Sequence, residues 1–314
     1  MIKSKVCELL GIKYPLFQGG MAWVADGKLA GAVSKAGGLG IIAAGGAPVE
    51  WVKQQIDIVR SITDNNFAVN IMLMSPTAPD VANLVCTEKV PVVTTGAGSP
   101  AKYIQMWKEH GIKVVPVVPS SSIAKRMERA GADAVIAEGM EGGGHVGELT
   151  TMALIPQVVD AVSIPVIAAG GIADGRGAAA AFMLGAEAIQ VGTRFLSAIE
   201  CGIHENYKQM VLSAKDTDTI ITGRSTGHPV RALKNKFTKQ MQTLDIENKP
   251  EEIEAKGGGA LRIAVQVGDL ETGSFMAGQI VGMVDSVQSC DDIIKEIISE
   301  CEDLLLNTGG HRVV

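Results

Sequence analysis

The chain has 314 residues, 46% of them hydrophobic, and a formal net charge of −6. This length accommodates either two domains or one large barrel with an insertion. The modest charge and the regularly recurring apolar runs exclude a disordered chain. No basic patch dominates, which argues against a nucleic-acid partner. No apolar run reaches the roughly 18 residues of a membrane-spanning helix, so we expect no membrane segment.

The cysteines and histidines favour a cytoplasmic protein without a transition-metal site. The five cysteines are an odd number and none lies in a CxxC pair, so we expect reduced thiols. The first ten residues contain three charged side chains and do not resemble a signal peptide. His110, His204 and His311 have no cysteine or carboxylate at metal-ligand spacing, so we predict no metal ligands. The cysteines are Cys7, Cys86, Cys201, Cys290 and Cys301.

Short β-rich runs alternate with helical patterns over the first 200 residues, and their starts are 21 to 30 residues apart. Several runs are continuously apolar, as in parallel strands that are buried on both faces. Eight strand–helix units suit either an open doubly wound sheet or a closed barrel. Because eight is the number of the TIM (β/α)8 barrel, we predict that fold. The predicted strands are Tyr14–Phe17, Leu39–Ala43, Phe67–Leu73, Val90–Thr95, Lys113–Val118, Ala134–Glu138, Ile164–Ala169 and Ala188–Val191.

Capping residues mark several of the intervening helices. Asp26 can cap a helix that Gly37-Gly38 ends, and Gly131 follows a second helical pattern. We predict helices over Ser120–Ala130 and Gly175–Leu184.

The pattern changes after about residue 200. We predict a barrel over residues 1–200 and a smaller, mainly helical domain over 201–286. One helix of this domain is predicted over Gln240–Lys256 and ends at a run of three glycines. The amphipathic segment Asp291–Leu306 predicts a helix within residues 287–314 that packs back on the barrel.

Glycine-bearing turns follow the seventh and eighth predicted strands, at Gly170-Gly171 and Gly192-Thr193. In TIM barrels these two turns often bind phosphate through backbone N–H groups and a helix N-terminus. Glycine has no side chain, so it allows the ligand to approach the backbone closely. The alternative is that these glycines only form tight turns without binding a ligand. Because both turns follow the two strands after which TIM barrels often bind phosphate, we favour a phosphate site.

A second glycine-rich loop, residues 138–148, follows the sixth predicted strand. Its His145 is the only histidine near a predicted strand carboxyl end, where it can exchange a proton near pH 7. A solvated loop histidine is the alternative, and the flanking glycines favour function.

Other segments carry weaker signals. The turn Gly20-Met21-Ala22 can wrap one face of a flat ring, or be an ordinary turn. Asn70 is an amide in an apolar strand, so it needs a partner, either a ligand or barrel backbone. Residues 96–101 match G-x-G-x-x-A, but the next strand lacks an acidic residue at its end, which argues against a dinucleotide site. Residues 223–229 form either a lid or a plain connection.

Together these motifs resemble the flavin-dependent enoyl-acyl carrier protein reductase II family of bacteria, which is related to the nitronate monooxygenases, also called 2-nitropropane dioxygenases. Residues 18–23, the histidine loop and residues 222–231 are more similar to the reductase branch. Close relatives often have serine where this chain has Gly142, so a hydroxyl contact to the flavin is absent here if the relatives use one. The similar segments are residues 15–23, 32–40, 70–73, 138–148, 169–172, 190–195, 222–231 and 273–279.

The resemblance implies FMN, with its phosphate on the turns after strands seven and eight. It implies NAD(P)H as co-substrate, a trans-2-enoyl thioester on acyl carrier protein as substrate, and a proton supplied or organised at C2 by His145. Some relatives need a monovalent cation, and relatives commonly form dimers. The implied cofactor-binding residues are Gly20, Met21, Ala22, Asn70, Glu138, Gly143, Gly144, Ala169, Gly170, Gly171, Gly192, Thr193, Met276 and Gln279.

Two other functions stay open on the sequence. The same site in a nitronate monooxygenase would oxidise alkyl nitronates with O₂. A barrel that binds a phosphorylated ligand without redox chemistry is the third possibility. Acyl carrier protein is acidic, so Arg231, Lys234, Lys236 and Lys239 are candidates to dock it, with an ordinary solvated helix face as the alternative.

Overall fold

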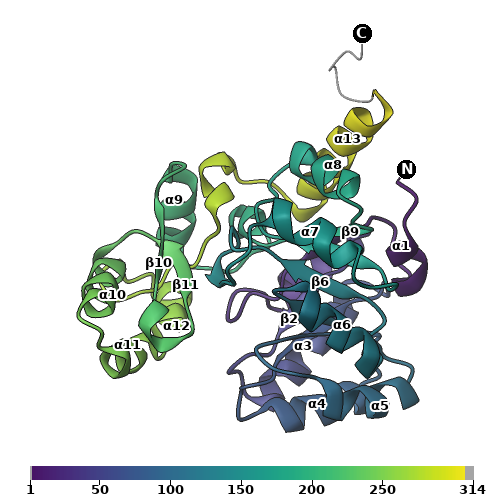
Figure 1. Cartoon of the computed structure of the whole chain (residues 1–314), viewed down its shortest axis with the longest axis horizontal. Coiled ribbons are helices and arrows are strands. Elements are labelled where there is room, and N and C mark those ends of the chain that lie inside the picture. The colour runs from purple at the N-terminus through teal and green to yellow at the C-terminus, as the bar shows by residue number, and fades with distance from the viewer. Residues whose placement is uncertain (1, 308–314) are drawn as a thin grey trace.

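Eight parallel strands form the centre of the computed structural model, which describes residues 2–307 (Figure 1). Their order is β1-β9-β8-β6-β5-β4-β3-β2. The two end strands are joined by backbone hydrogen bonds from Gln18 to Leu39 (3.0 Å) and from Leu39 to Leu16 (2.9 Å), which close the barrel. The predicted TIM barrel is therefore confirmed. Its strands are β1 (Leu16–Gln18), β2 (Ile41–Ala43), β3 (Ala68–Met72), β4 (Val92–Gly96), β5 (Lys113–Val118), β6 (Val135–Glu138), β8 (Val166–Ala169) and β9 (Ala188–Val191).

The buried side chain of Gln18 reinforces the closure. Its Oε1 accepts the backbone N–H of Ile41 at 3.1 Å, so one side chain continues the ladder where β1 meets β2. A buried amide is stabilising only when it is hydrogen-bonded, and Gln18 meets that condition through its neighbour's backbone.

Helices surround the barrel, and several begin and end at the predicted caps. Asp26 Oδ1 accepts from the amides of Lys28 and Leu29 at the start of α2. Gly131, with a φ of 101°, ends α6 as predicted. The helices of this layer are α1 (Lys5–Leu10), α2 (Gly27–Lys35), α3 (Val49–Ile62), α4 (Ala78–Thr87), α5 (Ala101–Glu109), α6 (Ser121–Ala130), α7 (Thr151–Val159), α8 (Gly175–Met183) and the C-terminal α13 (Cys290–Leu306).

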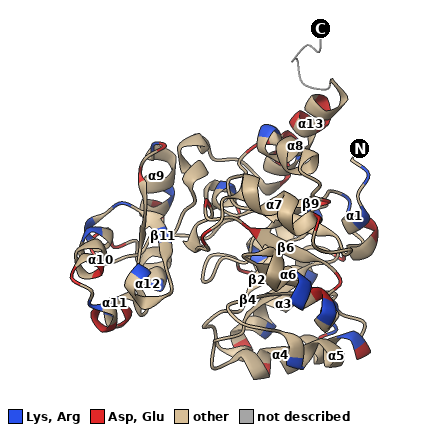
Figure 2. Ribbon diagram, viewed as in Figure 1, with Lys and Arg blue, Asp and Glu red and all other residues tan. Residues whose placement is uncertain are grey.

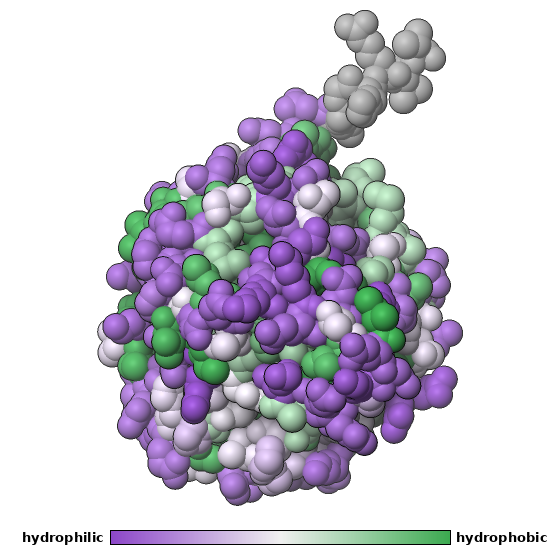
Figure 3. Space-filling model, turned by 90° about the vertical axis from the view of Figure 1, so that its left-hand side faces the viewer, coloured by the Kyte–Doolittle hydropathy of each residue, from purple (hydrophilic) through white to green (hydrophobic). Residues whose placement is uncertain are grey.

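A smaller lobe lies beside the barrel, at the left of Figure 1. It contains helices, as predicted, and also an antiparallel sheet of order β10-β11-β7 that the sequence interpretation missed. Its outer face is mainly hydrophilic with separate hydrophobic groups (Figure 3). The elements are β7 (Gly144–His145), α9 (Glu205–Ser213), β10 (Thr219–Thr222), β11 (Val230–Leu233), α10 (Lys236–Ile246), α11 (Pro250–Gly257) and α12 (Ala260–Gln266), with short 3₁₀ helices η2 (Arg224–Thr226) and η3 (Gln279–Met283). A further 3₁₀ helix, η1 (Thr193–Ser197), follows β9 in the barrel.

The single helix predicted over Gln240–Lys256 is wrong. The chain forms α10 and α11 instead, separated by a turn in which Asn248 has a φ of 53°. Pro250 begins α11, because proline lacks an N–H and is accommodated in the first turn of a helix but not in its interior.

The C-terminal helix α13 packs against α8 and α2 of the barrel. Charged residues lie mainly on the outer helices, with both signs mixed (Figure 2). Within residues 2–307 no helix is long and apolar enough to cross a membrane. We propose the division into a barrel over 1–200, a smaller domain over 201–286 and a returning segment over 287–314. His311 lies outside the described residues.

Candidate functional site

The carboxyl ends of the barrel strands bring most of the predicted residues to one rim. Glu138 and Ala169 end the neighbouring strands β6 and β8, and Gly192 directly follows β9. Hydrogen bonds link successive turns along this rim: Gly139 donates to Ala169 O at 2.9 Å, and Gly19 donates to Val191 O at 2.9 Å. This is the end at which barrel enzymes place their chemistry.

The turn after β8 requires glycine at both of its positions. Gly170 and Gly171 have φ values of 90° and 72°, in the left-handed region. A Cβ on Gly170 would also lie 2.7 Å from the carbonyl oxygen of Gly139. The Thr151 hydroxyl lies 2.9 Å from Gly170 O and fixes the turn from α7. The sequence did not single out Thr151.

Backbone amides at these turns are free to bind an anion. Among the hydrogen bonds of residues 2–307, none uses the amide of Gly171, Gly192 or Thr193. By contrast, protein carboxylates occupy the N-terminus of α8: Asp174 accepts from Gly177 at 3.1 Å, and Glu300 accepts from Gly175 at 2.7 Å. The free donors therefore come from the two turns and the start of η1. They do not come from α8, the helix that opens after the first turn.

A segment from far along the chain completes this part of the rim. Thr193 Oγ1 accepts the amide of Gly278 at 2.8 Å, and Glu141 O accepts the amide of Gln279 at 2.9 Å. A Cβ on Gly143 would lie 2.6 Å from the backbone of Ala277, so two main chains touch there. The sulfur of Met276 is 3.5 Å from the position of a Cβ on Gly144. The structure thus brings residues 276–279 to Gly143 and Gly144.

The turn after β1 lies beside the turn after β9 and packs against Asn70 of β3. A Cβ on Gly20 would lie 2.6 Å from Cβ of Asn70, so only glycine allows this approach. The sulfur of Met21 is 3.6 Å from the position of a Cβ on Gly192. Asn70 Nδ2 donates to Thr94 Oγ1 at 2.9 Å. Its partner is a side chain of β4, whereas the sequence led us to expect a ligand or backbone. Ala22 follows in the same turn and is half-buried.

Glu138 has a carboxyl that no protein group engages. Within residues 2–307 this carboxyl makes no hydrogen bond or ion pair. Although part of the residue surface is accessible, the carboxyl lies deep among protein atoms, and this burial raises its pKa from 4.5 to about 7. A carboxyl of this kind is suited to hydrogen-bond a polar ligand at the rim.

His145 belongs to the sheet of the smaller lobe. In β7 it pairs with Val230 of β11, and Val146 N donates to Pro229 O at 3.1 Å. The side chain is exposed. The surrounding protein still removes water from part of the ring, which lowers its pKa, and the charge of His228 lowers the pKa further. The ring is therefore neutral near pH 7, with one nitrogen that donates a hydrogen bond and one that accepts.

The loop over residues 223–229 is anchored and does not form an open lid. Asp245 of α10 accepts from the amide of Gly223 at 2.5 Å and from the hydroxyl of Ser225 at 2.7 Å. Arg224 and Glu148, both exposed, form an ion pair of 3.3 Å between this loop and the His145 loop. The segment is a connection that touches the site.

One of the four candidate docking residues is not at the surface. Arg231 is buried, and its guanidinium donates to the carbonyl of Met140 and to Thr219, so it is removed from the proposed docking set. Lys234 and Lys239 are exposed, and Lys236 forms an ion pair with Glu271. The sequence could not separate them, because strand β11 was not predicted.

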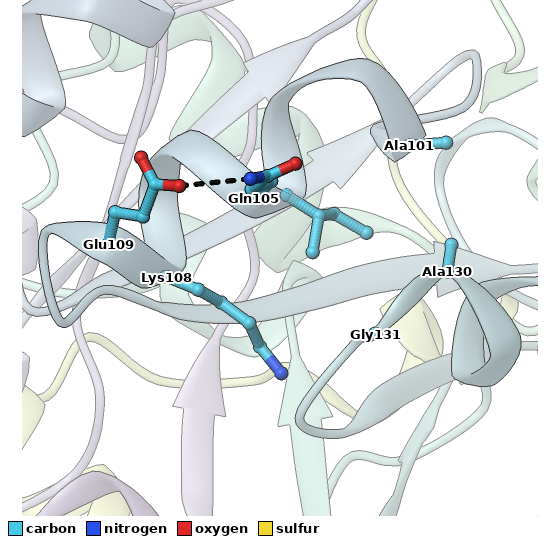
Figure 4. A pocket seen from close by; sticks show the side chains of 7 residues that line it. Ala101, Gln105, Lys108, Glu109, Ala130 and Gly131 are labelled. Atoms are coloured by element: carbon cyan, nitrogen blue, oxygen red, sulfur yellow. Dashed lines mark hydrogen bonds between the residues drawn. The ribbon is translucent and has the colours of Figure 1, made fainter.

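A cavity of about 570 Å³ lies elsewhere, in the outer helical layer between α5 and the end of α6 (Figure 4). Gln105 donates to Glu109 at 3.0 Å on one of its walls. None of the predicted site residues lines it. The rim is therefore the candidate active site, because the free amides and the free carboxyl lie there and the loop that carries His145 begins there.

Comparisons with known proteins show the family of the chain. A family model described as nitronate monooxygenase matches residues 3–85 and 80–300. A probable nitronate monooxygenase of Staphylococcus aureus is 32% identical, over 96% of this chain and 98% of its own length. A carboxyl-CoA dehydrogenase of Mycobacterium tuberculosis is also 32% identical, over 95% of both chains.

Two solved structures are similar over the full length. FabK from Thermotoga maritima has a TM-score of 0.96 and 50% identity, and the match covers 98% of this chain and 99% of FabK. Nitroalkane oxidase from Streptomyces ansochromogenes has a TM-score of 0.86 and 27% identity, over 97% of this chain and 99% of its own.

The fold and the site define a flavin-dependent oxidoreductase built on a TIM barrel. The chain belongs to the nitronate monooxygenase family.

Proposed function

We propose that this enzyme is an FMN-dependent reductase of trans-2-enoyl thioesters carried on acyl carrier protein, with NAD(P)H as the reductant. The likeness to FabK, at 50% identity over 98% of the chain, carries the proposal. The resemblance of the Gly-Gly-His-x-Gly-Glu loop to the reductase II family supports it.

The rim fits a flavin mononucleotide. The free amides of Gly171, Gly192 and Thr193 would receive the phosphate. Asn70 and the free carboxyl of Glu138 would contact the polar edges of the ligand. When bound, FMN would supply the hydride transfer from NAD(P)H to C3 of the thioester. The further contacts that we propose are Gly20, Met21, Ala22, Gly143, Gly144, Ala169, Gly170, Met276 and Gln279.

The protein itself would manage the proton. His145 lies on the loop that follows β6, so this loop begins at the same rim. Because its pKa is lowered, the ring would be neutral near pH 7, and it would donate a hydrogen bond through its N–H to the developing enolate. A water molecule that the ring organises would supply the proton at C2, and the exposed position of the ring allows solvent to replace it.

A second candidate is nitronate monooxygenase. The observation in its favour is the name shared by the curated relatives at 32% identity. There His145 would orient an anionic nitronate or accept a proton, and O₂ would be the oxidant.

Anaerobic spectroscopy separates the two functions. The flavin is first reduced with NADH or NADPH, and crotonyl thioester is then added. We expect the oxidised flavin absorbance to return, with no such return on nitronate addition. Rapid O₂ consumption with alkyl nitronates, together with no reoxidation by the thioester, would establish the monooxygenase instead. The same titration reveals which nicotinamide is preferred.

We also propose a cytoplasmic homodimer and a monovalent-cation requirement. Sedimentation in sodium, potassium and ammonium buffers, with turnover measured in each, tests both. A monomer at working concentration, or equal turnover in all three salts and in a buffer without them, would remove the corresponding proposal.

A further inference from the structure

A buried arginine connects the smaller lobe to the histidine loop. Arg231 of β11 is only 4% exposed. Its Nε and Nη2 donate to the carbonyl of Met140 at 3.3 and 3.1 Å, and its Nη1 donates to Thr219 Oγ1 at 3.1 Å. Within residues 2–307 no carboxylate lies within ion-pair distance of it, and Glu141 attracts it only over a longer range.

Burial of such a cation is costly unless its hydrogen bonds are made. Arg194, the other buried arginine among residues 2–307, has the carboxylate of Glu296 at 3.7 Å. Arg231 has a carbonyl oxygen in that place. The desolvated guanidinium of Arg231 therefore has one backbone carbonyl, Met140 O, as its main partner. This arrangement indicates that the position of the Met140 carbonyl matters to the loop.

Met140 lies two residues before a run of three glycines, residues 142–144, and Gly144 is the last of the run. Arg231 holds the chain on both sides of Gly142 and Gly143. Its side chain binds Met140 O, and its backbone position pairs with Gly144 in the β11–β7 register. Glycine has the largest backbone freedom of any residue and no side chain that could form a contact. A run of glycines is therefore ordered only where other residues restrain it. His145 is the next residue.

We propose that Arg231 is a positioning residue for His145, an inference that rests on the proposed role of His145 in thioester reduction. A planar guanidinium can reach one carbonyl with two N–H groups and Thr219 with a third, whereas an ammonium cannot span both in that geometry. The restraint acts on the loop that carries His145. The phosphate turns have anchors of their own, the hydroxyl of Thr151 on Gly170 O and that of Thr193 on the amide of Gly278, and they meet the loop through the carboxylate of Glu141.

The two half-reactions separate this role from a purely structural one. For Arg231→Lys and Arg231→Met we expect unchanged FMN content and an unchanged rate of flavin reduction by NAD(P)H. The reoxidation rate with crotonyl thioester should fall by roughly 10- to 100-fold, because a misplacement of about 1 Å costs rate of that order. Arg224→Met is the matched control, since Arg224 touches the same loop from an exposed position, and we expect less than a threefold change.

Hydrogen exchange gives a readout that is independent of turnover. The amide of Val146, which bonds to Pro229 O, should exchange faster in both Arg231 variants while the barrel strands keep their protection. If both variants fail to fold, Thr219→Val removes one guanidinium partner with little change in volume and should reduce reoxidation about two- to fivefold, an extension of the same geometric argument.

The outcomes distinguish the two proposals. Equal losses in both half-reactions, or unchanged reoxidation and Val146 exchange, would overturn the positioning role. If the unaltered enzyme is not reoxidised by the thioester, the proposed function fails, and the Val146 exchange still decides whether Arg231 restrains the loop.

Discussion

The two halves of the rim are built in different ways. The turn after β8 is held by the barrel, through two left-handed glycines and the hydroxyl of Thr151, and the turn after β9 also bonds the backbone of Gly278 through the hydroxyl of Thr193. The His145 loop is held by the smaller lobe, as a short strand against β11. Ligand anchoring therefore lies on a rigid scaffold, and proton delivery lies on an element shared between two parts of the molecule. Substitutions should affect one half without the other.

Removal of the histidine should give the largest effect. We expect His145→Ala to lower reoxidation of the reduced flavin by enoyl thioester roughly 10²- to 10⁴-fold, the usual contribution of a positioned acid or base. Flavin reduction and FMN content should not change, because the substitution leaves in place Glu141, the loop residue that bonds Thr151 beside the phosphate turn. Stopped-flow measurement of each half-reaction tests this, with His110→Ala on the exposed end of α5 as the control. Equal loss in both half-reactions would contradict the separation of the two halves.

Glu138 lies where the barrel passes into the His145 loop, and it should make the flavin-free protein sensitive to pH. Its pKa is raised from 4.5 to about 7. The folded state therefore holds the proton more tightly than the unfolded state, so this stabilisation is full below pH 4.5 and is lost as the pH rises through about 7.

Relative to Glu138→Gln, the unaltered protein should lose about 3 kcal/mol of unfolding free energy between pH 4.5 and 8. Urea unfolding at both pH values measures this. Glu109→Gln, on the exposed face of α5, should change the free energy little and equally at both pH values. A pH dependence that is identical with and without Glu138 would show that its carboxyl is not desolvated.

The phosphate turn can be tested with one methyl group. Gly170→Ala forces a left-handed residue to carry a Cβ that lies 2.7 Å from Gly139 O. We expect FMN affinity to fall about 10- to 100-fold, because such strain costs about 1–3 kcal/mol. Fluorescence titration of the flavin-free protein measures it. Gly111→Ala has a similar φ of 75° and open space around its Cβ, so it imposes backbone strain far from the rim and should leave FMN affinity unchanged.

Loss of the contact between the C-terminal helix and the part of the rim that holds the phosphate turns should have the smallest effect on stability and FMN affinity. Arg194 follows Thr193, and its ion pair with Glu296 of α13 is 3.7 Å long, but Glu296 is 54% exposed. Water and salt screen such a pair, so Glu296→Gln should cost below about 1 kcal/mol and change FMN affinity less than twofold. Thermal unfolding and the same titration check this. A larger loss would mean that α13 takes part in holding the phosphate turn.

The predictability of the site differs between its halves in the same way. Gly170-Gly171 and Gly192-Thr193 were identified because the order of strands along a barrel fixes which turns meet, and glycine marks those turns. Residues such as Thr151, Glu141 and Arg231 were missed. Their partners lie 10 to 138 positions away in the chain, from Glu141–Thr151 to Glu141–Gln279, and no local sequence pattern predicts a contact of that kind. Arg231 was even assigned to the surface, since β11 is a short strand in a segment without regular periodicity.

The amino-acid sequence by itself determined the eight strands, the caps that begin and end the helices, and the glycines at the rim, because these depend on local backbone preference and on periodic burial. Tertiary structure alone decided that α8 has no free N-terminus, that the residues around Gly278 reach Thr193, and that His145 joins the sheet of the smaller lobe. Those features are pairings between distant segments, and their free energy comes from desolvated hydrogen bonds that exist only once the chain has folded.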